Sequence, residues 1–143
     1  MYTAFPARLK REENDTFTVT FRDVPEAITF VEDRRNPNPI ASEALATALS
    51  FYVEAGRPCP VASELKRGEV MIYLAAATVA KLALYETMRA QGITQSELAR
   101  RLGCHRQHVA RIVDPAHNTN FDVLEAALAA VNKRAALVIQ DAA

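Results

Sequence analysis

Residues 94–113, with the sequence TQSELARRLGCHRQHVARIV, constrain the fold of this chain more than any other stretch. The hydroxyl of Thr94 can cap a helix, and Glu97, three residues later, can close a reciprocal capping box. Gly103 then supplies a turn after the first helix. The residues between the cap and the turn place one apolar face at helical spacing: Leu98, Ala99 and Leu102.

A second short helix is expected from about His105, with Val109 and Ile112 buried. The small Ala99 suits the place where the two helices must approach closely. Two short helices joined by a glycine-containing turn, with exposed Arg and Gln near the start of the second, describe a helix-turn-helix. The stretch therefore predicts a module that reads a DNA sequence.

The candidate DNA contacts lie on the outer face of this module. Arginine suits guanine and glutamine suits adenine, because each can make two hydrogen bonds to that base, although ordinary solvated helix surface is the alternative. Thr94 and Gln95 are phosphate candidates, since backbone N–H groups point outward at a helix N-terminus. For Arg100 and Arg101, a phosphate contact and a solvated pair are equally compatible with the pattern. The candidate set is Thr94, Gln95, Arg106, Gln107, His108 and Arg111.

The charge distribution supports this assignment more than the net charge of zero does. Residues 1–77 contain 9 Lys/Arg and 11 Asp/Glu, whereas residues 78–143 contain 8 and 6. Within residues 94–113 four arginines face a single glutamate. Non-specific affinity for DNA depends on such a local positive field. The patch is modest, so one copy alone should bind weakly.

The first half of the chain predicts strands and one helix. Strict alternation of Phe17, Val19 and Phe21 with threonines has the period of a half-buried antiparallel strand. Asn38 as cap and Pro39 as first helical residue should begin a helix that ends near Gly56. The resulting order is β-β-β-α-β, a helix on a small antiparallel sheet. The expected strands are residues 2–9, 16–21, 27–31 and 69–74, with an irregular connector over 57–67.

The second half predicts a bundle of about four helices. A helix from Ala76 to Gly92 should bury one face that contains Val79, Leu82, Ala83 and Met88. The helix-turn-helix follows, and a last helix from about residue 121 should bury Phe121, Leu124, Leu128 and Val131. Residues 135–140 (AALVIQ) are apolar enough to form a strand, which we expect to pair with its copy in a dimer.

Several functional classes find no support in the sequence. No apolar run reaches the roughly 20 residues of a membrane helix, and the N-terminus lacks the features of a signal peptide. Cys59 and Cys104 fit neither a zinc-ligand spacing nor a disulfide framework, so a reducing cytoplasm is expected. The three histidines lack partners at ligand spacing. We therefore expect no metal, no cofactor and no membrane association.

The whole chain resembles the HicB-type antitoxins of the HicA–HicB toxin–antitoxin systems. The residues that carry the resemblance are TFTVTFRDVPEAIT, ALATALSFYVEAG, VMIYLAAATVAKL and GITQSELARRLG, in that order. The resemblance implies an α+β protein with two domains. Residues 1–75 would form a partial RNase H-like domain that binds the toxin, and residues 76–143 an all-α, lambda-repressor-like helix-turn-helix domain with the dimerisation strand.

The function implied by this resemblance is dual. The N-terminal domain would sterically mask a HicA-type ribonuclease that cleaves mRNA, and the C-terminal domain would bind double-stranded operator DNA as a dimer or higher oligomer. An RNase H-like shape raises the question of nuclease activity. The carboxylates Asp15, Asp23, Glu26, Glu32 and Asp33 lie in turns and loops, which favours turn chemistry over catalysis, so no enzyme is expected.

Two other functions stay open at this point. A one-component regulator whose N-terminal domain senses a small ligand ranks second, and an active nuclease ranks third. A neighbouring gene for a short basic protein would favour the antitoxin, and a ligand-sized pocket would favour the sensor.

Overall fold

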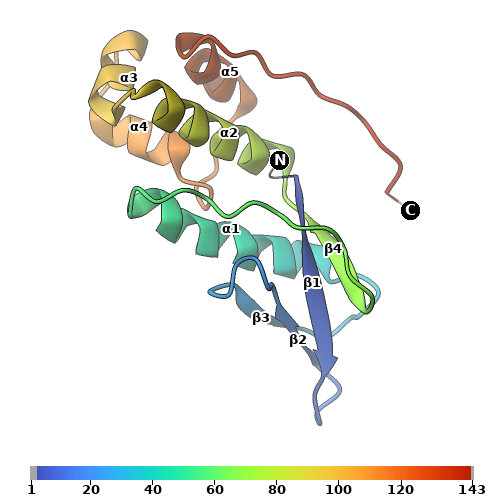
Figure 1. Ribbon diagram of the computed structural model, residues 1–143. Helices are drawn as coiled ribbons and strands as arrows, with labels where there is room; N and C mark the ends of the chain where they lie inside the picture. Colours follow the sequence, from blue (N-terminus) through green and yellow to red (C-terminus); the bar gives the residue numbers. More distant parts are fainter. Residues whose placement is uncertain (1–2, 143) are drawn as a thin grey trace.

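The computed structural model describes residues 3–142, which form an α+β fold of one antiparallel sheet and five helices (Figure 1). The strands are β1 (Ala4–Arg11), β2 (Phe17–Thr20), β3 (Ile28–Val31) and β4 (Glu69–Tyr73). The helices are α1 (Asn38–Glu54), α2 (Ala76–Gln91), α3 (Gln95–Leu102), α4 (Arg106–Val113) and α5 (Phe121–Ala130). The predicted order of elements is confirmed as far as α5.

The four strands are arranged in the order β3-β2-β1-β4, and every pair is antiparallel. Alternation along the strands places Phe5 opposite Ile72 and Leu9 opposite Val19 on one face, and α1 packs against the sheet at β3 and β4. Phe5, Val19 and Ile72 are fully buried. The predicted helix on a small antiparallel sheet is therefore confirmed, while the pairing of β4 with β1 is a long-range choice that alternation alone does not specify.

The first strand ends later than expected. Its predicted start at Tyr2 lies outside the described residues. The strand continues to Arg11, because Lys10 pairs with Thr18 and Arg11 with Phe17 across the hairpin. Hairpin pairing thus extends β1 by two residues past the predicted end.

Asn38 does not cap α1 with its side chain, contrary to the prediction. Its amide instead joins the helix start to the sheet: Asn38 Oδ1 accepts a 2.7 Å hydrogen bond from Tyr73 N–H, and Asn38 Nδ2 donates a 3.1 Å bond to Tyr73 C=O. An Asn side chain carries one acceptor and one donor group, as a peptide unit does. It therefore pairs with the end of β4 as a neighbouring strand would.

The helices α2 to α5 pack against one another, which confirms the predicted bundle. Two predicted apolar faces need correction. Ala83 on α2 is exposed, whereas Lys81 is buried, and Phe121 at the start of α5 is partly exposed. On α2 a different face is buried because the helix is covered from two sides, by α4 and α5 and by residues 57–59 of the connector. Its buried residues are Ala80, Lys81, Leu82, Leu84, Tyr85 and Met88.

The connector after α1 links the sheet to the helices through polar contacts. Tyr85 donates a 2.9 Å hydrogen bond from its hydroxyl to Arg57 C=O, and Glu86 accepts a 3.0 Å bond from Cys59 N–H. Cys59 is buried there, and its burial, with the nearby Glu86 charge, raises the thiol pKa to about 12. Buried residues of both halves form one continuous apolar core.

Residues 135–140 do not form a strand in this single chain, so that expectation is not met within the protomer. The segment runs as an extended trace away from α5 (Figure 1), and Leu137, Val138 and Ile139 are highly exposed. A strand needs a hydrogen-bonded neighbour, and none of the described strands reaches this segment. Among residues 3–142, no helix combines the length and apolar character needed to cross a bilayer.

Candidate nucleic-acid interface

The helix α3 begins and ends as its sequence dictates. Thr94 has an extended backbone, and its hydroxyl oxygen accepts a 3.1 Å hydrogen bond from Glu97 N–H, which confirms the predicted cap. Gly103 ends the helix with a left-handed φ of 67°, a conformation that favours glycine. Leu98 and Ala99 are buried against the neighbouring helices.

The reciprocal half of the expected capping box is not formed. The Glu97 carboxylate instead accepts hydrogen bonds of 2.6 and 2.9 Å from Arg100 and one of 3.1 Å from Arg101. These charge-assisted bonds lower the pKa of Glu97 to about 2. Two guanidinium groups one turn along the helix outcompete the N–H of Thr94 for this carboxylate, because both carry a full positive charge.

Arg100 and Arg101 are therefore neither a free pair of solvated side chains nor fully available for a phosphate contact. Both are held by Glu97, and Arg101 also donates a 2.8 Å hydrogen bond to Ala130 C=O at the end of α5. This bond satisfies a carbonyl in the last turn of α5 and fixes α3 against it. The two arginines contribute charge to the region, but their guanidinium groups are already engaged.

The helix α4 presents a polar outer face that has no such engagement. Val109, Ile112 and Val113 are buried, as predicted for the first two. Within residues 3–142, none of the polar side chains on the outer face has a hydrogen-bonding or ion-pairing partner, and all are exposed. They are Arg106, Gln107, His108 and Arg111.

The other two candidates lie at the start of α3. Thr94 is exposed and Gln95, the first helical residue, is half-buried. Residues 103–105 form the turn between α3 and α4, and the two helices pack against each other. The six candidates thus occupy two consecutive, contacting helices, and the outward side chains of α4 are free to meet a ligand.

A buried lysine that the sequence pattern does not predict lies directly behind this face. Lys81 on α2 is 1% exposed, and its ammonium donates hydrogen bonds to Arg111 C=O (2.9 Å) and Thr119 Oγ1 (2.6 Å). Burial lowers the pKa of Lys81 to about 8, against a smaller opposite effect of Asp114. A signal was present, since Lys81 shares helical spacing with Leu84, Tyr85 and Met88, but lysine is rarely assigned to a core.

Four of the five carboxylates considered for a nuclease site have a structural partner. Asp15 pairs with Arg11 at 2.6 Å. Asp23 accepts bonds from the backbone and side chain of Ser63, Glu26 accepts one from Tyr52, and Asp33 accepts one from Arg35 N–H. No group of three His, Cys, Asp or Glu residues in the described part of the chain is placed to share a metal ion. These contacts agree with turn chemistry for four of the five positions; Glu32 has no such contact among the described residues.

Comparison with known proteins finds similarity to bacterial antitoxins. The model of a family described as HicB-like antitoxin of bacterial toxin–antitoxin system matches residues 4–83. Antitoxin HicB 2 of Photorhabdus laumondii is 36% identical over 134 residues, which cover 94% of each chain. Antitoxin HicB of Escherichia coli K12 is 32% identical over 135 residues, covering 94% of this chain and 98% of the relative. Antitoxin HicB of Pseudomonas fluorescens is 31% identical over 132 residues, covering 92% and 90%.

Proposed function

This chain belongs to the HicB-like antitoxins of bacterial toxin–antitoxin systems, and on that premise we propose that it masks a toxin and represses its own operon. The toxin is a HicA-type ribonuclease that cleaves mRNA. Residues 1–75, a partial RNase H-like domain, bind it and cover its active site, and residues 76–143 bind operator DNA. The protein acts by steric cover and not by catalysis.

The DNA-binding unit of this proposal is a helix-turn-helix formed by α3 and α4. The helix α4 lies in the major groove, where arginine pairs with guanine and glutamine with adenine through two hydrogen bonds each. The observation that carries this assignment is the exposed outer face of α4, whose four polar side chains have no partner among the described residues. Side chains that make no intramolecular bonds lose none on binding DNA.

The start of α3 serves the DNA backbone in this arrangement. Thr94 already accepts a hydrogen bond from Glu97 N–H, but its hydroxyl hydrogen is still available to a phosphate oxygen. Gln95, one residue further, carries an amide donor. Contacts of this kind set the register of the protein on the duplex, and base contacts from α4 supply the specificity.

A dimer completes the proposal. Two copies of α4 about 34 Å apart would read a near-palindrome on one face of the duplex, and pairing doubles a modest basic patch. Residues 135–140 supply the pairing strand: Leu137, Val138 and Ile139 are exposed in the single chain and would be buried against their copies. An apolar, extended segment without a neighbour is suited to form strand pairs with another chain.

The experiment that tests operator binding is fluorescence anisotropy with DNA from upstream of this gene, at fixed salt and against a scrambled duplex. Wild type should bind the upstream DNA more tightly, and Arg106→Ala/Gln107→Ala should lose that preference. Loss of one good bidentate contact costs about 1–3 kcal/mol, roughly 5- to 150-fold in affinity.

The matched control is Arg35→Ala/Asn36→Ala, which removes one cation and one amide from an exposed loop of the other half of the chain. It should bind like wild type. Equal and weak binding of both duplexes by wild type would contradict autoregulation by this protein alone. Equal losses in both double variants would show that general charge, and not α4, carries the affinity.

A further inference from the structure

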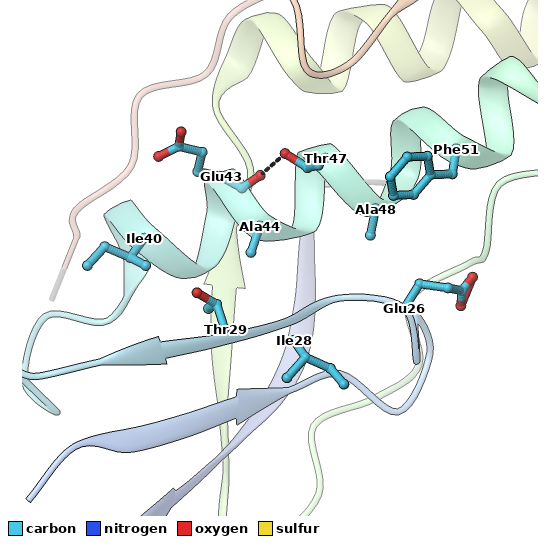
Figure 2. A pocket seen from close by; sticks show the side chains of 9 residues that line it. All are labelled: Glu26, Ile28, Thr29, Ile40, Glu43, Ala44, Thr47, Ala48 and Phe51. Carbon is cyan, nitrogen blue, oxygen red and sulfur yellow. Dashed lines mark hydrogen bonds between the residues drawn. The ribbon is translucent and has the colours of Figure 1, made fainter. Parts of the chain in front are cut away.

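A groove lies between the helix α1 and the edge strand β3 (Figure 2). Its volume is about 330 Å³. Figure 2 shows Ala44 and Ala48 pointing from α1 toward β3, Thr29 pointing from β3 toward the helix, and the Glu43 carboxylate directed outward from the rim. The small residues on α1 keep the floor open. The lining is Glu26, Ile28, Thr29, Ile40, Glu43, Ala44, Thr47, Ala48 and Phe51.

Large apolar side chains are exposed along this groove. Phe51 on α1 is 57% exposed, and Ile28 and Ile40 are 59% and 49% exposed. They lie on both walls of one groove, next to a floor of alanine and threonine side chains. Exposed apolar clusters with polar rims mark protein interaction sites, where a few side chains, many of them aromatic, dominate the binding energy.

The strand β3 also offers an open backbone edge. It pairs only with β2 among the described strands, so its other edge has no strand partner. At the opposite edge of the sheet, the Asn38 amide occupies both backbone groups of Tyr73 at the end of β4. An extended segment of a partner can add to an exposed edge such as that of β3.

The charged residues that line the groove, Glu26 and Glu43, are both acidic, although Arg34 and Arg35 follow β3 closely in the chain. Residues 23–33, which include β3, contain four Asp or Glu and no Lys or Arg. The helix α1 contains Glu43 and Glu54 and likewise no Lys or Arg. The nearby Arg34 lies over the ring of Phe17, with 5.9 Å from its guanidinium carbon to the ring centroid. A partner that suits this surface is therefore positively charged.

We propose that the α1–β3 groove is the docking surface for the basic ribonuclease toxin, and this inference rests on the proposed function. A ribonuclease must carry positive charge where it holds the phosphates of its RNA substrate. The acidic rim of the groove attracts that same surface, and Phe51 and Ile40 supply the apolar contact. Docking the RNA-binding surface of the toxin here would exclude RNA by steric cover.

The test measures the affinity of the full-length antitoxin for the purified HicA-type toxin of its operon by calorimetry. Phe51→Ala removes the aromatic contact of the groove, and Glu43→Lys reverses a charge at its rim whose carboxylate has no partner in residues 3–142. The control for the first is Phe30→Ala, because Phe30 is 61% exposed but lies outside the groove lining. The control for the second is Glu125→Lys, an exposed glutamate on α5.

We expect Phe51→Ala to weaken toxin binding about 30-fold, as for a hot-spot aromatic residue, and Glu43→Lys about tenfold with a reduced salt dependence. Both controls should stay within about twofold of wild type. Ribonuclease assays with a labelled RNA should show the same ranking, with toxin activity restored by the groove variants. Circular dichroism and retained operator binding verify that each variant is folded.

Other outcomes distinguish a failure of the proposed function from a failure of the groove assignment alone. If wild type does not bind the toxin, the proposed function fails and the groove assignment fails with it. If wild type binds and both groove variants bind equally well, only the groove assignment is overturned. A loss confined to Phe30→Ala would overturn it in favour of the uncovered sheet face. A dimer that dissociates on Phe51→Ala, with toxin binding intact, would overturn it in favour of a second copy.

Discussion

The ammonium of Lys81 lies 2.9 Å from the backbone carbonyl oxygen of Arg111 and holds the last turn of α4 from inside the protein. The side chain of Arg111 faces outward on the same helix, where we propose that it meets DNA. A cation near the carbonyl end of a helix is favourable for the helix dipole. Lys81 thus fixes the backbone of Arg111 on the buried side of α4, while the side chain of Arg111 stays free on the exposed side.

The burial of Lys81 predicts a stability that increases with pH. The folded-state pKa of about 8 is below its ordinary value of 10.5. Between these values the unfolded chain binds the proton and the folded chain does not, so the free energy of unfolding rises with pH in this window. Below about pH 8 the lysine is charged in both states, so it adds no pH dependence to the free energy of unfolding there.

The measurement is urea unfolding of wild type and Lys81→Met from pH 7 to pH 10. The difference in the free energy of unfolding, wild type minus variant, should rise by on the order of 2 kcal/mol across that range. Taking the difference cancels the titration of Cys59, whose raised pKa acts in the opposite direction. A difference that is constant with pH would show that the pKa of Lys81 is not lowered.

The capping contact of Thr94 predicts a stability loss on removal of its hydroxyl. Thr94→Ala leaves Glu97 N–H without its 3.1 Å acceptor and should lower the free energy of unfolding by about 1 kcal/mol. Thr94→Ser keeps the acceptor and should remain within about 0.3 kcal/mol of wild type. Thermal unfolding followed by circular dichroism measures both. Equal losses in the two variants would assign the effect to the methyl group and not to the cap.

The two arginines that share Glu97 should differ in their importance. Arg101 also bonds to Ala130 C=O, so Arg101→Ala should destabilise the helices by about 1 kcal/mol more than Arg100→Ala does. Among residues 3–142, Arg100 pairs only with Glu97, at the surface. Because both guanidinium groups are engaged, each single variant should retain the preference for operator DNA. Equal melting temperatures would contradict the role of Arg101 in joining α3 to α5.

The two cysteines should differ strongly in reactivity toward iodoacetamide at pH 8. Cys59 is buried and its thiol pKa is about 12, which lowers its thiolate fraction on the order of a thousandfold relative to a free thiol. Cys104 is half-buried and should be alkylated first. Mass spectrometry of the folded protein checks the order, and labelling in denaturant provides the control. Rapid modification of Cys59 in the folded chain would contradict its burial beside Glu86.

Local features of the sequence predicted most of the elements. Thr94 and Gly103 bounded α3 because a cap and a left-handed turn are properties of a few adjacent residues. Phe17, Val19 and Phe21 marked β2 because alternation alone separates the two faces of a strand. The outward face of α4 followed in the same way from the spacing of Val109 and Ile112.

The failures concern side chains whose partners are distant or compete. The local pattern predicts Asn38 as a helix cap, but Asn38 bonds to Tyr73, 35 residues later. It predicts a bond from Glu97 to the backbone of Thr94, but two arginines hold Glu97. It predicts Ala83 in the core, but the elements that pack against α2 bury Lys81 instead.

The sequence by itself determined where the helices and strands lie and which face of α4 is polar, because capping, glycine turns and hydrophobic period act over a few residues. Only the tertiary structure decided that β4 pairs with β1, that Lys81 lies behind Arg111, and that α1 and β3 border a groove with an acidic rim. These features depend on contacts between residues far apart in the chain. Each of these contacts depends on the packing of several distant segments at once, so a pattern of adjacent residues does not predict them.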